Sequence, residues 1–389
     1  MISEKYGINA FLRPDNSVGI RNHVLIIAAD YISGTVASNV GRMVYGVKAI
    51  LHPFGRVQFG KDLEMLFEVL SGCGSNPNVA AVVVVGADDV WSAKIADRIA
   101  RTGKPVEAYG IAGRGDIKTL EIVVRKAKEF VQYVSEVRRE SLDLSGLVFS
   151  LKCGESDTTS GLAANPALGY VVDKLYDLGN TIIFGETVEL TGAEDFIAER
   201  IVIPELREKF LRMYRDYVGV VESCGLDLLG SQPTEGNIRG GLSTIEEKAL
   251  GNIQKIGTKP IKCVLDFFDH LPKSGGGQLC FLNSPASAEL LTLEAAKGSV
   301  VNLFTTGQGS LLGNPIMPVV KITANPKTAK ILEDHIDVDI SDLLTLRVEL
   351  REAGERIFKY LIRVLNGRLT ANEVLMHEEF APLKLHLPA

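Results

Sequence analysis

The sequence has few cysteines, and none of them has the spacing of a zinc site or a disulfide framework. There are five, an odd number, with no CxxC pair among them. Disulfide-rich scaffolds need paired cysteines and an oxidising compartment. The sequence therefore predicts free thiols in a reducing cytoplasm.

Long apolar runs are also absent. A membrane-spanning helix needs about 20 consecutive apolar residues, whereas the longest apolar run here, Val79–Val85, has the length of a strand. The N-terminal residues lack the apolar core of a signal peptide. We therefore expect a cytoplasmic protein with no membrane partner.

An excess of basic residues is missing as well. Lys and Arg number 42 against 48 Asp and Glu, for a net charge of −6, which argues against a nucleic-acid surface. The segment Gly55–Lys61 has the spacing of a phosphate-binding loop, but Asp62 stands where Ser or Thr should hold magnesium. No GxGxxG pattern follows Val24–Ala28. The sequence predicts no nucleotide cofactor and leaves room for a small acidic substrate.

Apolar strands alternate with amphipathic helices over the first third of the chain. We expect strands at Val24–Ala28, Val47–Leu51, Val79–Val85 and Pro105–Ile111, and helices at Ser33–Val44, Asp62–Leu70, Val90–Arg101 and Lys118–Arg138. Such strands indicate a parallel sheet covered on both faces. After a charged stretch at 136–143, expected to be a helix end and linker, a second strand–helix pattern begins. The predicted fold is α/β with two domains, a Rossmann-like parallel-sheet unit at 1–142 and a second α/β unit at 143–389.

Polar loops follow the strands of the second unit. The loop that begins at Cys153 brings a thiol, carboxylates and hydroxyls together, and further hydroxyl, amide and carboxylate groups follow later strands. Asp157 in this loop is either a ligand of a divalent cation or the N-cap of a helix. Ligands of open α/β sheets bind at the carboxyl ends of strands. Such loops suit a polyhydroxylated acid, because each hydroxyl group of a buried substrate needs a hydrogen-bond partner.

Six blocks of sequence resemble, in order, the altronate/galactarate dehydratase family. They are FLRPDNSVGIRNHVLII, KCGESDTTSGLAANPALG, GETVELTGAEDF, EGNIRGGLSTIEEKALGNIQK, LNSPASAELLTLEAAKG and FTTGQGSLLGN, and they extend from about residue 11 to about residue 340. The resemblance implies a lyase that removes water or sulfite from a small 2-hydroxy acid, such as an aldonate, an aldarate or sulfolactate, to give a 2-keto acid. It also implies a divalent metal, commonly Fe²⁺.

The layout is similar to that of the stand-alone large subunit of sulfolactate sulfo-lyase, a member of the same family. In other members, a small N-terminal domain is part of the same chain. Here the first large-domain block begins within a dozen residues of the start. The resemblance therefore implies a separate small partner subunit, and we also expect a homo-oligomer.

Individual residues take their expected roles from these blocks. The expected catalytic residues are His52, Arg21 and Glu186, with Arg21 as a clamp for a carboxylate and His52 as a base or metal ligand. The alternative for Arg21 is a structural ion pair. Cys153, Asp157 and His52 are the expected metal ligands. The expected substrate-binding residues are Asn22, Ser156, Ser160, Asn165, Asn237, Arg239, Asn283, Ser284, Thr305 and Thr306.

The N-terminal unit departs from the family pattern. Arg56 and Ile32 stand where the family has cysteines, neither Cys nor Glu stands at the expected places around Asp88, and Gln308 replaces an expected arginine. Three interpretations follow. A harder site for Mn²⁺, Mg²⁺ or Ca²⁺ could form from Asp88, Asp89, His52 and Asp157. Arg56 could provide the charge that a metal provides elsewhere. Alternatively, the chain is a non-catalytic sugar-acid-binding or regulatory paralogue.

Overall fold

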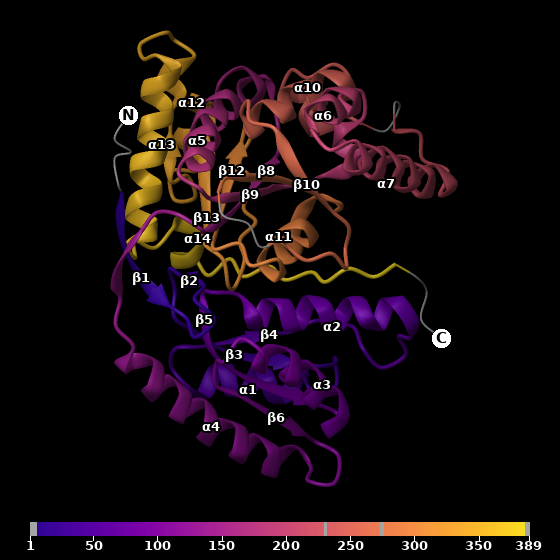
Figure 1. The fold of residues 1–389 in the computed structure, drawn as a ribbon, viewed down its shortest axis with the longest axis vertical. Coiled ribbons are helices and arrows are strands. Elements are labelled where there is room, and N and C mark those ends of the chain that lie inside the picture. The colour runs from indigo at the N-terminus through magenta and orange to yellow at the C-terminus, as the bar shows by residue number, and fades with distance from the viewer. Residues whose placement is uncertain (1–5, 229–231, 273–275, 386–389) are drawn as a thin grey trace.

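Two parallel sheets form the framework of the computed structural model, which describes residues 6–228, 232–272 and 276–385 (Figure 1). The first sheet has the strand order β4-β3-β5-β6, with every pair parallel. Its strands are β3 (His23–Ala28), β4 (Val47–Ile50), β5 (Val79–Gly86) and β6 (Val106–Gly110), and its helices are α1 (Gly34–Met43), α2 (Gly60–Ser75), α3 (Asp89–Ala100) and α4 (Asp116–Glu136). The predicted strands and helices of this unit are present, with their ends shifted by a few residues.

The side chains of the strands explain why helices cover both faces of this sheet. On β3, Leu25 and Ile27 pack in the cluster that contains α2 and α3, whereas Ile26 and Ala28 pack in the cluster that contains α1 and α4. Successive side chains of a strand point to opposite faces, so an apolar strand needs a cover on each side. The predicted α/β class, with two α/β units, is confirmed.

The second sheet has seven parallel strands in the order β10-β11-β9-β8-β12-β13-β14. The strands are β8 (Val148–Gly154), β9 (Thr181–Phe184), β10 (Ile261–Leu265), β11 (Gln278–Leu282), β12 (Val301–Thr306), β13 (Val319–Thr323) and β14 (Val338–Asp339). The chain builds from β8 towards β10 on one side and then returns to β12 on the other side of β8. The sheet therefore reverses its direction of growth at β8, and such a point is where open α/β sheets bind ligands.

The helices of the second unit cover this sheet. They are α5 (Asn165–Asp177), α6 (Glu194–Arg200), α7 (Pro204–Ser223), α9 (Glu235–Arg239), α10 (Ile245–Ile253), α11 (Ser287–Ala296), α12 (Pro326–Ile331), α13 (Leu350–Leu365) and α14 (Ala371–Val374), with short turns η1 (Ser160–Ala164), η2 (Thr187–Leu190), η3 (Gln254–Ile256) and η4 (Ser341–Leu343). The helical stretch from Glu194 to Ser223 is divided into two helices, α6 and α7. It breaks because Ile201 bridges to Ile261 beside β10, and Pro204 then begins α7.

A small antiparallel sheet lies where the two units meet in the chain. It consists of β1 (Gly7–Leu12), β2 (Val18–Gly19) and β7 (Glu140–Asp143), with β1 in the middle. The charged stretch at 136–143 is therefore not only a helix end and linker, because its last four residues pair as a strand with β1. The predicted domain boundary, between residues 142 and 143, falls inside β7.

The two units share an apolar core. Helices α2 and α11 pack against each other between the sheets, and one cluster of buried side chains includes residues of both sheets (Figure 1). The C-terminal segment also joins the units, since the Leu385 amide donates a hydrogen bond to Asp62 Oδ1 at 2.6 Å. Within the described residues, no helix has both the length and the apolar character needed to cross a membrane.

Candidate active site

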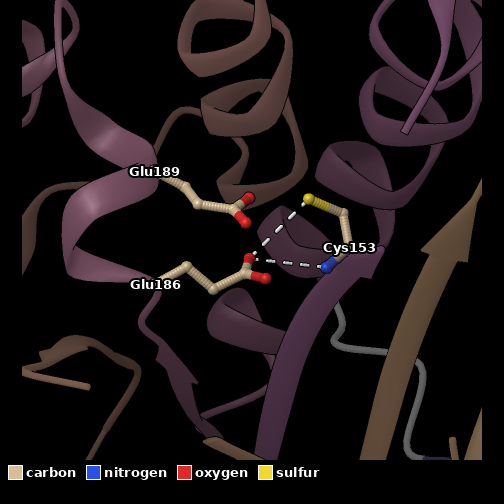
Figure 2. Close-up of side chains that lie close together, drawn as sticks. All are labelled: Cys153, Glu186 and Glu189. Carbon is tan, nitrogen blue, oxygen red and sulfur yellow. Dashed lines mark hydrogen bonds between the residues drawn. The ribbon is translucent and has the colours of Figure 1, made fainter. Parts of the chain in front are cut away.

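A cluster of charged side chains lies at the carboxyl ends of the central strands of the second sheet. Lys152 and Cys153 are at the end of β8, and Glu186 directly follows β9. Glu189 is on η2, and Figure 2 shows it with Cys153 and Glu186, all pointing toward one another. Lys255 reaches the same point from η3. The cluster is at the position that the reversal of strand order predicts for a ligand site.

Glu186 is at the centre of this cluster and is completely buried. Its Oε1 accepts a hydrogen bond from Lys152 Nζ at 2.7 Å, and its Oε2 accepts one from Lys255 Nζ at 3.0 Å. Lys255 Nζ also lies 3.6 Å from Cys153 Sγ, which in turn lies 3.7 Å from Glu186 Oε2. One carboxylate therefore holds two buried ammonium groups against a thiol.

The pKa values in the cluster follow from burial and from these ion pairs. Burial alone would raise the pKa of Glu186, but Lys152 and Lys255 outweigh it and lower this pKa to about 2. Burial opposes the charge of the lysines, whereas Glu186 and Cys153 favour it, and the pKa of each lysine is raised. Burial, followed by the charge of Glu186, raises the pKa of the Cys153 thiol to about 11. At neutral pH Glu186 is therefore a carboxylate between two ammonium groups, and Cys153 is a neutral thiol.

A cavity of about 150 Å³ opens beside the cluster. Lys152, Cys153 and Glu189 line it, together with Lys248 from α10. Lys248 Nζ lies 3.2 Å from Glu189 Oε1, and both side chains are mostly buried. Glu155 also lines the cavity, so three ammonium groups and three carboxylates lie in or next to it, and Lys152 and Lys248 are the cations that an anionic ligand can contact.

The backbone at Gly185 and Glu186 lies very close to the side chain of Ser284. Glu186 has φ +71°, in the left-handed region, and its amide donates to Ser284 Oγ at 3.0 Å. A Cβ at Gly185 would lie 2.3 Å from the same Ser284 oxygen, so only glycine fits there. Thr187 Oγ1 donates to Asn283 Oδ1 at 2.9 Å. Asn283 and Ser284, predicted to bind substrate, therefore hold the Glu186 turn in place.

Two of the predicted substrate-binding residues line the cavity, namely Ser156 and Asn237. Ser160 and Asn165 instead line a neighbouring cavity of about 320 Å³, which Ser156 also borders. The other two predicted hydroxyls brace strand ends. Thr305 Oγ1 donates to Asn165 Oδ1 at 2.6 Å, and Thr306 Oγ1 donates to the Gly154 carbonyl at 2.8 Å.

Asp157 has the role of a helix cap. Its Oδ1 accepts hydrogen bonds from the Ser160 amide at 3.0 Å and from Thr159 Oγ1 at 2.6 Å. Its Oδ2 accepts from Asn325 Nδ2 at 2.8 Å. Both oxygens are therefore occupied within the protein, as the N-cap interpretation predicted, and the structure does not bring Asp157 into the Cys153 group.

His52 and its neighbours in the first unit do not join the cluster. His52 Nε2 contacts the Ala28 carbonyl at 2.8 Å, and its Nδ1 accepts from the Phe54 amide at 3.2 Å. Burial lowers the pKa of His52. Asp88 caps α3 and pairs with Arg56 at 3.3 Å, while Asp89 pairs with Arg114. These contacts give His52, Asp88 and Asp89 structural roles. Among the residues that the structure describes, Asp88, Asp89, His52 and Asp157 do not come together as a metal site for Mn²⁺, Mg²⁺ or Ca²⁺.

Arg21 and Asn22 are structural residues, contrary to the expectation that they bind substrate. Arg21 forms a bidentate ion pair with Glu373, at 2.6 and 2.8 Å, and its remaining donors reach backbone carbonyls. Asn22 donates to the Val134 carbonyl at 2.7 Å and accepts from Arg13 at 2.8 Å. No donor of Arg21 is left for a substrate carboxylate, because the guanidinium joins the two units instead. Arg239 is exposed and lies 3.6 Å from Glu235, outside the cavity lining.

We expect Arg21→Met to lower the free energy of unfolding by about 3–5 kcal/mol, because the mostly buried carboxylate of Glu373 loses its only ion-pair partner among the described residues and retains only hydrogen bonds from Thr370. Denaturant unfolding measures this change. Arg125→Met, which removes an exposed pair with Glu121, is the control and should change stability by less than about 0.5 kcal/mol. Unchanged stability together with a raised KM would instead make Arg21 a substrate clamp.

The charged cluster can be tested as a metal site. Cys153, Glu186 and Glu189 are the one group of three or more candidate ligands within the described residues, with ligand atoms within 4.8 Å of one another. Metal–oxygen bonds are about 2.1 Å long, so an ion on Glu186 Oε2 would lie at most about 5 Å from Lys255 Nζ. At an effective dielectric constant of 20, this ammonium group would repel a divalent ion by about 7 kcal/mol. The arrangement therefore does not fit the metal that the family resemblance implied.

Sequence reasoning missed the three lysines of this site. Lys248 and Lys255 are seven residues apart, a spacing that places both on one face of a helix, and α10 continues directly into η3. Lys152 stands in a largely apolar strand, where an unpaired charge is costly. These two signals could have identified the lysines as partners of buried carboxylates.

The comparisons with known proteins assign the chain to a family. Residues 144–387 match the model for the C-terminal domain of D-galactarate/altronate dehydratase, and residues 10–135 match the model for the second domain of D-galactarate dehydratase/altronate hydrolase. The chain therefore belongs to the D-galactarate/altronate dehydratase family of lyases, as the sequence blocks predicted.

Three individual relatives are similar to the chain over two thirds or more of its length. The chain is 48% identical to the (2R)-sulfolactate sulfo-lyase subunit beta of Chromohalobacter salexigens, over 97% of each chain. It is 27% identical to altronate dehydratase of Bacillus subtilis, over 98% of this chain and 78% of that protein. It is also 31% identical to galactarate dehydratase (L-threo-forming) of Escherichia coli, over 68% of this chain and 51% of that protein.

Proposed function

We propose that this chain is the catalytic subunit of a lyase that eliminates sulfite from sulfolactate or a closely similar small, dianionic 2-hydroxy acid. The observation that carries the proposal is the 48% identity to a (2R)-sulfolactate sulfo-lyase subunit over nearly the whole of both chains. The charge of the site supports it. Lys152 and Lys248 both line the cavity, and each ammonium group can bind one of the two anionic groups of such a substrate.

The cavity suggests how such a substrate binds. Lys152 and Lys248 reach it with their ammonium groups, and they are suited to the carboxylate and the sulfonate. Asn237 borders the same space, although its amide also donates to the Ser156 carbonyl at 2.8 Å. The Ser156 side chain forms no hydrogen bond to another described residue and is free to contact the substrate hydroxyl. The reacting carbons would then lie between the two lysines.

Glu189 is the proposed base. Glu186 is held by two lysines and its pKa of about 2 makes it a weak base, whereas the thiol of Cys153 is neutral at pH 7. Glu189 faces the cavity with a single ion-pair partner. It would take the proton from C2, the C2 electrons would form a double bond to C3, and the C3–sulfur bond would break to release sulfite. The resulting enol takes up a proton at C3 and loses its hydroxyl proton, which gives the 2-keto acid.

A second subunit completes the proposal. The name of the 48% identical relative includes "subunit beta", so we infer that this chain also works with a separate partner chain, the small subunit. The partner would bind next to the cavity and close it against water, which strengthens electrostatic interactions within the site.

We expect the chain, mixed with its partner, to convert sulfolactate to pyruvate and sulfite. Coupled lactate dehydrogenase measures pyruvate and a thiol-reactive dye measures sulfite, so the two products should appear in equal amounts. Altronate and galactarate serve as comparison substrates and should react much more slowly. A ligand that raises the melting temperature without turnover would instead support the non-catalytic binding paralogue.

A further inference from the structure

A buried lysine stands at the place where the family resemblance implies a metal ion. Lys255 is 1% exposed. Its ammonium group contacts two of the three atoms that could bind a metal, Glu186 Oε2 at 3.0 Å and Cys153 Sγ at 3.6 Å. A metal ion bound to both atoms would compete with Lys255 for their lone pairs.

The position of Lys255 is fixed from several directions. It follows α10 directly in η3, and η3 packs against α5. A Cβ at Gly169 of α5 would lie 2.4 Å from the Gln254 carbonyl, so only glycine allows this close approach of the two elements. The ammonium group is therefore held in place by the backbone as well as by its ion pair.

We propose that Lys255 is a built-in cation of this site, which takes the place of a divalent metal against Cys153 and Glu186. Lys255 and Lys152 together provide two fixed positive charges next to the substrate cavity. Negative charge develops on the substrate carboxylate when the C2 proton leaves, and preorganised positive charge stabilises it. This catalytic part rests on the proposed lyase function, whereas the exclusion of metal can be tested without it.

Replacement of Lys255 should allow a metal ion to bind at Cys153 and Glu186. Lys255→Met keeps a similar length and removes the charge, which leaves Cys153 Sγ and Glu186 Oε2 without their ammonium neighbour, while Lys152 and Lys248 keep their pairs with Glu186 and Glu189. We expect one equivalent of Co²⁺ to bind this variant roughly 100-fold or more tightly than the wild type, because a like charge has been removed from its neighbourhood. Because thiolates bind such ions, a sulfur-to-cobalt absorption band should appear with the same stoichiometry.

The experiment is a Co²⁺ titration of the full-length chain, followed by absorption and by calorimetry. Lys255→Met combined with Cys153→Ser should lose the sulfur band, which identifies the thiol as a ligand. Lys259→Met, which removes a partly exposed pair with Asp177, is the matched control and should behave as the wild type does. Lys255→Gln is a second variant in case the methionine variant does not fold, as judged by circular dichroism.

Two results would overturn the inference. The first is a stoichiometric sulfur-to-cobalt band in the wild type, since Lys255 would then not exclude a metal. The second is a folded Lys255 variant that binds Co²⁺ no better than the wild type does. Both results are independent of turnover. If the metal titration succeeds and no acid is converted, the lyase proposal fails and the inference about Lys255 stands.

Discussion

Glu189→Gln should lower kcat of the proposed elimination by about 10²–10⁴-fold, the usual contribution of a positioned general base. The amide cannot accept the C2 proton, but it retains the size and shape of the carboxylate. Because Lys152 and Lys248 still reach the cavity, KM should change much less than kcat. A loss in kcat with a nearly constant KM is the signature of an interaction made in the transition state.

Steady-state kinetics and isotope exchange test this prediction together. The wild type should exchange the C2 hydrogen of the substrate with deuterated water, and Glu189→Gln should not. Glu199→Gln, an exposed residue of the neighbouring helix α6, is the control and should keep full activity. If Glu189→Gln retains kcat within about threefold of the wild type, another group is the base.

The fold was largely predictable because short segments of the sequence are enough to indicate its strands, helices and loops. The strand Val79–Val85 is entirely apolar, and a strand of this kind needs helices on both faces. The structure buries the whole of β5 in this way. The polar loops after the strands also indicated the correct edge of the second sheet, since parallel strands end on the same side.

The site was less predictable because its contacts connect residues that are far apart in the sequence. Lys152 and Glu186 are 34 positions apart and meet only because β8 pairs with β9. Arg21 and Glu373 are 352 positions apart, so the sequence could not distinguish a substrate clamp from a structural ion pair. Lysines are usually at the surface, and only a carboxylate brought to them by the fold explains their burial.

Glu186 is expected to make the largest contribution to stability among the site residues. Glu186→Gln leaves Lys152 and Lys255 buried without their shared counter-charge, a change that costs about 3–5 kcal/mol for buried pairs. The lowered pKa of Glu186 gives a similar magnitude for its contribution to the free energy of unfolding. A decrease from 4.5 to about 2 corresponds to about 3 kcal/mol at neutral pH.

The pH dependence distinguishes this effect from a simple packing defect. The pKa of Glu186 is lower in the folded state than in the unfolded chain, so its contribution is complete above about pH 4.5 and disappears as the pH falls towards 2. Glutamine resembles the protonated acid. The unfolding free energies of the wild type and Glu186→Gln should therefore converge over this window, as measured by urea unfolding at several pH values. A difference that stays constant down to pH 2 would mean that packing, and not charge, is the reason for the loss.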